Sequence, residues 1–284
     1  MQIAQRAYRG FLSLSLSGLL LGAMSSGHAE QVAVSPQIPE AYQSFVITIF
    51  VPCGSDSLDP SSVDINLSNN TITVDSISAD YPECPLNPKL ANIMGLPAGT
   101  YSVERKHQGN DFVDQSYGSL TVSAAPPTQP AFAFYNEGIK HYFITASTAE
   151  KNSLLGGGGG GGWAIVDNGF NAWPADGPAP AAAKPVCRFY SAAVNSHFYT
   201  AGAGECEMLK QPSSGWTYEG ITFRALVPTK GSCYPGTTPV WRLYNDRFAQ
   251  SDSNHRFVSS EDTYRHMIAN GWVGEGVAFC SPES

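Results

Sequence analysis

Aromatic residues, histidine and glutamate recur at regular intervals in the second half of this chain of 284 residues. Aromatic rings stack on the apolar faces of sugar rings, and carboxylates accept hydrogen bonds from sugar hydroxyls. These residue types therefore indicate a glycan-binding site. Two successive occurrences of this pattern contain the candidate ligand-binding residues. They are Tyr190, His197, Trp216, Glu219, Tyr244, His255, Trp272 and Glu275.

The same residues also have structural explanations. Rings that recur along a chain can build a shared core, which is the alternative for Trp163, Trp216 and Trp272. Glu219 and Glu275 each precede a glycine, so a role in a turn competes with a role in binding. A histidine can cap a turn instead of contacting a ligand, and three of them open an expected strand: His141, His197 and His255.

Catalytic motifs are missing from the sequence, which contains no GxSxG, no HExxH and no P-loop. Glycines 156–162 match GxGxxG only because every residue is glycine, so we expect a flexible loop there. Glu205 and Glu207 lie together at an expected helix start, where they favour the helix dipole and do not face each other across a cleft. We therefore expect no catalytic residues, no metal and no cofactor.

The first 29 residues have the layout of a secretory signal peptide. Arg6 and Arg9 precede an apolar run over residues 11–24, and small residues at Gly27 and Ala29 suit a cleavage site. No later stretch is long and apolar enough to span a membrane, so we expect no membrane contact after cleavage. The six cysteines include no CxxC, and in a secreted or periplasmic protein they indicate disulfides before zinc.

Composition favours an all-β protein with short helices. Charged residues make up only 14% of the chain, while Gly and Pro number 28 and 20, which suits many turns. The net charge of −8 gives no general attraction to nucleic acid, so no nucleic-acid partner is expected.

Residues 30–124 alternate short β-prone runs with turns, as in an immunoglobulin-like sandwich. Residues 63–67 and 71–74 flank an Asn-rich turn and predict a hairpin. Cys53 and Cys84 are the two cysteines of this segment and are expected to pair. A Pro-rich linker over 125–130 separates the sandwich from a second domain.

The second domain, residues 131–284, contains three repeats at about 131–180, 185–232 and 238–284. Tyr135, Tyr190 and Tyr244 are 55 and 54 residues apart, and in every repeat a Phe follows a Trp after seven residues. Each repeat is expected to contain two strands, a short helix and two further strands. Units of this size bury too little surface alone, so we expect one pseudo-threefold, β-trefoil-like body.

Several motifs of the second and third repeats are similar to those of an uncharacterised family of repeat domains. The motifs are Cys187-Arg188-Phe189-Tyr190, Ser196-His197-Phe198-Tyr199-Thr200-Ala201, Glu205-Cys206, Gly215-Trp216-Thr217-Tyr218-Glu219-Gly220, Trp241-Arg242-Leu243-Tyr244, Gly271-Trp272-Val273 and Glu275-Gly276. Members of this family are found at the C-termini of secreted bacterial proteins, often attached to hydrolases, which implies an accessory role at a cell wall or other polymer. The first repeat departs from the pattern, because the glycine run replaces the usual connection to Trp163 and the Glu-Gly pair is lost.

Four cysteines of the repeat domain allow three connectivities. Cys187 and Cys206 flank the second repeat's hairpin and helix start, and Cys233 and Cys280 flank the third repeat, so we expect those two pairs. The leading functional hypothesis is non-catalytic binding to an extracellular or cell-wall glycan. The alternatives are a structural or adhesive module with a protein partner and, third, an accessory hydrolase.

Overall fold

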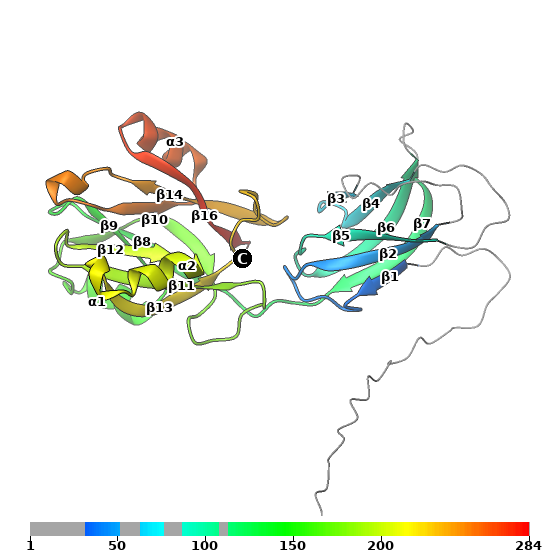
Figure 1. The fold of residues 1–284 in the computed structure, drawn as a ribbon, viewed down its shortest axis with the longest axis horizontal. Coiled ribbons are helices and arrows are strands. Elements are labelled where there is room, and N and C mark those ends of the chain that lie inside the picture. Colours follow the sequence, from blue (N-terminus) through cyan, green and yellow to red (C-terminus); the bar gives the residue numbers. More distant parts are fainter. Residues whose placement is uncertain (1–31, 52–62, 77–86, 108–112, 284) are drawn as a thin grey trace, which may run out of the picture.

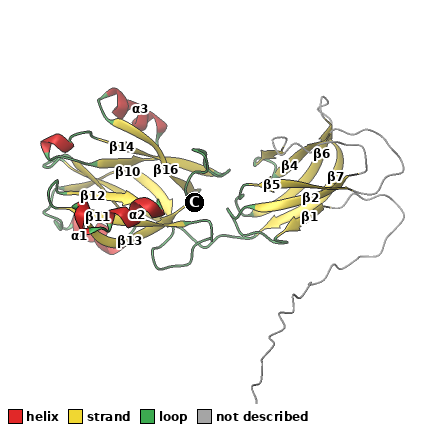
Figure 2. Ribbon diagram, viewed as in Figure 1, coloured by secondary structure: helices red, strands yellow, loops and turns green. Residues whose placement is uncertain are grey.

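The structure is a computed structural model, and it describes residues 32–51, 63–76, 87–107 and 113–283. The expected signal peptide and the expected Cys53–Cys84 pair lie outside the described residues. The chain is mostly β, as predicted, and its helices are few and short (Figure 2). Among the described residues, no helix combines the length and apolar character that a membrane crossing requires.

The described residues of the N-terminal part form seven strands in two sheets (Figure 1). One sheet has the order β1-β2-β5, and the other has the order β3-β4-β6-β7. The strands are β1 (Val32–Ser35), β2 (Phe45–Val51), β3 (Val63–Asn66), β4 (Thr71–Ser76), β5 (Asn87–Ile93), β6 (Gly99–His107) and β7 (Val113–Val122).

The predicted hairpin is present, since β3 and β4 pair antiparallel from Val63–Val74 to Asn66–Thr71. Strands β4 and β6 run parallel, whereas the other pairs within the two sheets are antiparallel. Fully buried side chains from both sheets, such as Ile47 and Ile72, share one core. Burying these apolar surfaces is what holds the two sheets face to face.

The repeat domain contains nine strands, which form three sheets of three strands each, and three α-helices. The expected last two strands of each repeat are one long strand, so the prediction of four strands per repeat is wrong. The elements are β8 (Gln129–Asn136), β9 (His141–Thr145), α1 (Thr148–Leu155), β10 (Trp163–Ala172), β11 (Lys184–Ser191), β12 (Ser196–Thr200), α2 (Ala203–Leu209), β13 (Thr217–Ala225), β14 (Thr237–Tyr244), β15 (His255–Val258), α3 (Glu261–Ala269) and β16 (Val273–Pro282).

A β-bulge explains why each long strand resembled two. In β13 the pairing with β11 skips Glu219, and Gly220 takes a left-handed backbone with φ of 115°. The same irregularity interrupts β16 at Glu275 and Gly276. A glycine at positive φ is typical of a bulge and does not end the strand.

The three repeats share one core. The phenylalanines that follow the tryptophans by seven residues, Phe170, Phe223 and Phe279, have ring centroids 5.6–5.9 Å apart in all three pairings. All three are buried, and the cluster around them draws on every repeat. One repeat could not cover such a core alone, which is the physical reason that the units occur together.

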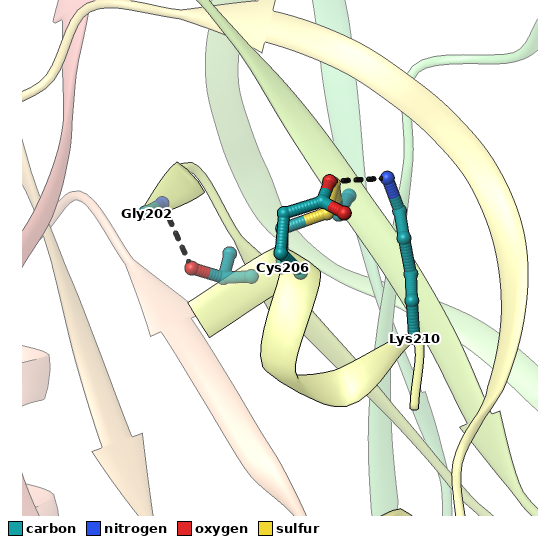
Figure 3. The surroundings of a disulfide bond; sticks show 6 residues. Gly202, Cys206 and Lys210 are labelled. Carbon is teal, nitrogen blue, oxygen red and sulfur yellow. Dashed lines mark hydrogen bonds and ion pairs between the residues drawn. A yellow bond between two sulfur atoms is a disulfide. The ribbon is translucent and has the colours of Figure 1, made fainter. Parts of the chain in front are cut away.

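The short helices lie at the outside of the repeat domain (Figure 2). Ser147 and Ser260 cap the starts of α1 and α3 by accepting a backbone N–H. Gly202 precedes α2 and offers no side-chain cap, and there the Cys187–Cys206 disulfide ties the helix to β11 instead (Figure 3). The Cys233–Cys280 disulfide is also formed, so both expected pairs of this domain are confirmed.

The sandwich packs against the repeat domain around Trp173. This fully buried side chain donates from Nε1 to the Pro126 carbonyl, and its ring lies 6.2 Å from that of Tyr42. Tyr42 also meets Tyr234, with the ring centroids 6.1 Å apart. Strand β8 begins at Gln129, so the end of the expected linker is part of the first repeat.

Candidate functional site

The strand register identifies equivalent residues in the three repeats. Each hairpin places a second ring opposite the shared tyrosine, with centroids 4.6–5.0 Å apart, in the pairs Tyr135–Tyr142, Tyr190–His197 and Tyr244–His255. Tyr142 is therefore the equivalent of the two later histidines. His141 lies one residue earlier, opposite Asn136, so its predicted equivalence with His197 and His255 is wrong.

His141 instead links the three repeats where they meet. Its Nδ1 lies 3.0 Å from the carbonyl oxygen of Asn195 in the second repeat, and its Nε2 lies 2.7 Å from Oδ1 of Asp252 in the third. The buried ring thus makes polar contacts through both of its nitrogens, one with each neighbouring repeat. Burial alone would raise the pKa of Asp252, but hydrogen bonds from His141 and Arg247 outweigh burial and lower it.

Asn254 completes this link between repeats. Its Oδ1 accepts the Tyr142 N–H at 2.7 Å, and its Nδ2 donates to the Tyr142 carbonyl at 3.1 Å and to Ser196 Oγ at 2.9 Å. His141, Ser196 and Asn254 occupy the same register position in their hairpins, and all three are buried. The residues at this position therefore connect the repeats, so it is a structural position.

A cavity of about 460 Å³ opens between the first and second repeats. Helix α1 and strands β9 and β10 form one side, and strands β11, β12 and β13 form the other. Aromatic and charged side chains face the same space. They include Phe143, Glu150, Trp163, Arg188, Tyr190, His197 and Glu219.

Arg188 connects the two sides of this cavity. Its Nη1 donates to Glu150 Oε2 from the first repeat, and its Nε donates to Glu219 Oε2 from the second, both at 2.8 Å. Glu219 is the bulged residue of β13, and a bulge re-aims a side chain that would otherwise follow the strand alternation. The sequence left a turn and a place in the site as alternatives for the Glu-Gly pair. In the structure the pair forms a bulge, and the Glu219 carboxylate also lines the cavity.

His197 is neutral in this setting. Burial, together with the positive charge of Arg188, lowers its pKa to about 4. Its Nε2 lies 3.4 Å from Glu219 Oε2, and its ring meets Phe143 edge-on with centroids 4.8 Å apart. Arg188 itself keeps its charge, because the nearby acidic groups raise its pKa although burial opposes them.

The second and third repeats contain the same network. Arg242 Nε donates to Glu275 Oε2 at 2.7 Å, and its Nη1 lies 3.7 Å from Glu205 Oε2 of α2. Burial and the charge of Arg242 lower the pKa of His255 to about 3. Trp216 packs against Phe198, with centroids 5.9 Å apart, as part of a small core beside the disulfide.

The boundary between the third and first repeats differs. The registers place Ala133 opposite Ile144 where Arg188 faces Tyr199, so the first repeat lacks this arginine. At this boundary Arg256 of the third repeat forms the ion pair with the first repeat instead, because its Nη2 lies 3.4 Å from Asp167 Oδ2. Its guanidinium lies 4.4 Å from the centre of the Tyr142 ring, and Trp272 meets the same ring edge-on.

Gly159 of the glycine run lines the first cavity, and carbonyls of this run accept hydrogen bonds from side chains of the first repeat. The Gly159 carbonyl accepts a hydrogen bond from Trp163 Nε1 at 3.0 Å, and the Gly161 carbonyl accepts one from Asn136 Nδ2 at 2.7 Å. A Cβ on Gly159 would come within 3.2 Å of the Trp163 indole nitrogen. Glycine therefore lets the backbone approach and hold this ring.

The candidate residues thus divide among different places. Tyr190, His197 and Glu219 come together in the first cavity, whereas Trp272 lines another cavity and Trp216 packs in a core. Tyr244, His255 and Glu275 surround the Arg242 network. Sequence reasoning did not select four residues that complete these networks: Glu150, Trp163, Arg188 and Arg242. The two arginines could have been identified from a shared motif, in which Arg is followed by an apolar residue and then by Tyr, at residues 188–190 and 242–244.

Among the described residues, no group of three or more His, Cys, Asp or Glu side chains is placed to hold a metal ion. No curated protein matches the chain, and no solved structure matches it either. Residues 130–282 match the family described as "Domain of unknown function (DUF5648)", and this match covers the whole three-repeat region. Since that region is more than half of the chain, the protein belongs to the DUF5648 family.

Proposed function

We propose that the protein is exported and that its repeat domain binds an extracellular or cell-wall glycan without catalysis. The observation that carries the proposal is the cavity between the first and second repeats, where Trp163 and Tyr190 lie beside a fixed set of charged groups. Aromatic faces suit pyranose rings, and preorganised polar groups provide specificity in such sites. The cavity volume of about 460 Å³ is within the range of small-ligand sites.

The carboxylates of this cavity support binding over hydrolysis. Glu150 and Glu219 both accept a hydrogen bond from the Arg188 guanidinium. A glycosidase uses two carboxyl groups, one to protonate the leaving group and one as base or nucleophile. Two carboxylates that share one guanidinium are better suited to accepting hydrogen bonds from sugar hydroxyls.

Export is supported by the two disulfides of the repeat domain, which persist in oxidising compartments. The alternatives from the sequence, an adhesive module for a protein partner and an accessory hydrolase, predict different outcomes in the same experiment. A protein-binding module would retain no glycan, and a hydrolase would release fragments from the polymer.

The test is a glycan array and a pull-down with peptidoglycan, both using the purified, disulfide-bonded chain. The key variant is Tyr190→Ala, which removes a ring from the first cavity. Tyr244→Ala is the matched control, because Tyr244 holds the equivalent register position in the third repeat and does not line this cavity.

We expect the unaltered chain to retain a glycan, Tyr190→Ala to weaken retention at least tenfold, and Tyr244→Ala to keep it within about twofold. Stacking of one ring contributes enough for such a loss. No retention on any glycan or on peptidoglycan would refute the proposal, and so would equal losses in the two variants.

A further inference from the structure

A second cavity, of about 490 Å³, lies between the third and first repeats. It repeats the position of the first cavity, because the register makes its two tyrosines equivalent to Tyr190 and His197. Its aromatic side chains are Tyr135, Tyr142 and Trp272. The molecule thus offers two equivalent aromatic spaces with different charged groups.

The aromatic wall of the second cavity is fixed in place. Tyr135 and Tyr142 lie with ring centroids 4.6 Å apart, and Trp272 meets Tyr142 edge-on at 5.7 Å. The Arg256 guanidinium lies over the Tyr142 ring, and its Nη1 donates a hydrogen bond to the Tyr142 hydroxyl at 3.2 Å. A wall that does not reorganise on binding keeps the entropic cost of association low.

The charges of the second cavity differ from those of the first. Its lining includes two cations, Lys140 and Arg247, and one carboxylate, Asp252. The first cavity has the opposite balance, since two carboxylates, Glu150 and Glu219, face one arginine whose Nε and Nη1 are both used.

The Asp252 carboxylate is already satisfied by groups of the protein. Its Oδ1 lies 2.7 Å from His141 Nε2, and its Oδ2 accepts from Arg247 Nε at 2.5 Å. Arg247 uses only Nε in this pair, so its two terminal nitrogens remain for a ligand. Lys140 pairs with Glu137, which is exposed and does not line the cavity.

We propose that this second cavity binds a carboxylate-bearing saccharide, such as a uronic acid unit of a polymer. The sugar ring packs on Trp272, and its carboxylate accepts from the terminal nitrogens of Arg247. An arginine fork matches a carboxylate with two parallel hydrogen bonds, which gives selectivity for the acid over a neutral sugar. This inference rests on the proposed glycan binding by the domain and assigns a second, acid-selective site to it.

The test measures binding of tetragalacturonate and of its carboxyl-reduced, neutral counterpart by calorimetry. The variants are Arg247→Gln and Trp272→Ala in the second cavity, with Tyr244→Ala, which lines neither cavity, as the matched control. The Arg247 side chain is 59% exposed, and Asp252 keeps its bond to His141 in Arg247→Gln, so this variant leaves the core unchanged.

We expect Arg247→Gln and Trp272→Ala each to weaken tetragalacturonate binding at least tenfold, and Tyr244→Ala to change it less than twofold. We also expect the neutral counterpart to bind the unaltered chain at least tenfold more weakly than the acid. No binding of tetragalacturonate, or binding that Arg247→Gln leaves unchanged, would overturn the inference. If a neutral glycan still binds through Tyr190 in that case, the acid-selective site fails and the proposed function stands.

Discussion

Two partly buried histidines, His197 and His255, predict a specific loss of stability in acid. His197 and His255 have pKa values of about 4 and about 3 in the folded protein, below the ordinary 6.5, so the folded state excludes a proton that the unfolded chain accepts. The sign follows from this difference. Stability is fully present above pH 6.5 and is lost as the pH falls from there toward the folded pKa values.

The size of the effect follows from linkage. Between pH 7.5 and pH 5 each histidine lowers the free energy of unfolding by about 2 kcal/mol, and the two together by about 4 kcal/mol. His255→Gln removes one titrating ring without adding a charge. We expect this variant to lose only about half as much stability as the unaltered chain over the same pH interval.

The assay is urea unfolding at pH 7.5 and at pH 5 without reductant, followed by tryptophan fluorescence. All five tryptophans belong to the repeat domain, and one of them, Trp173, lies at its contact with the N-terminal sheets. His266→Gln is the matched control, because His266 lies exposed on α3. This control is expected to retain the full pH dependence.

Two results would refute the reasoning. One is an unfolding free energy of the unaltered chain that changes by less than about 1 kcal/mol between the two pH values. The other is an equal acid loss in His255→Gln and in the unaltered chain, which would place the titrating groups elsewhere.

Three further predictions concern stability, measured by the same fluorescence assay at pH 7.5. Replacing both Cys187 and Cys206 by Ala opens a loop with a sequence separation of 19 and is expected to cost about 3 kcal/mol; an unchanged midpoint contradicts this. Phe223→Ala, in the fully buried centre, is expected to cost about 3–5 kcal/mol, whereas Phe248→Ala, 72% exposed, is expected to cost under about 0.5 kcal/mol. His141→Ala removes the link between repeats and is expected to cost about 2 kcal/mol, and a neutral effect would count against that link.

Much of the fold could be predicted from the sequence because the repeats share a core. The spacing from Trp to Phe marks the three rings that meet at the centre, and core positions must recur when one body is built from equivalent units. The number of strands per repeat could not be predicted in the same way. A Glu-Gly step is as typical of a turn as of a bulge, and only the pairing of β13 with β11 shows that the strand continues past Gly220.

The site was harder to predict because side chains of different repeats form it together. Glu150 precedes Arg188 by 38 residues and still shares its guanidinium with Glu219. His141 matches the later histidines by residue type, but strand register gives their position to Tyr142. Equivalence of residue type along the chain therefore does not establish equivalence of position.

The central claim is that a glycan occupies the cavity beside Trp163. The most direct measurement records the indole N–H signals of the five tryptophans by NMR while soluble fragments of the retained polymer are titrated into the protein. The Trp163 signal is expected to shift with saturation, because its Nε1 is held by the cavity wall, while the signal of the fully buried Trp173 stays unchanged. Saturable binding that leaves the Trp163 signal unmoved would contradict the claim.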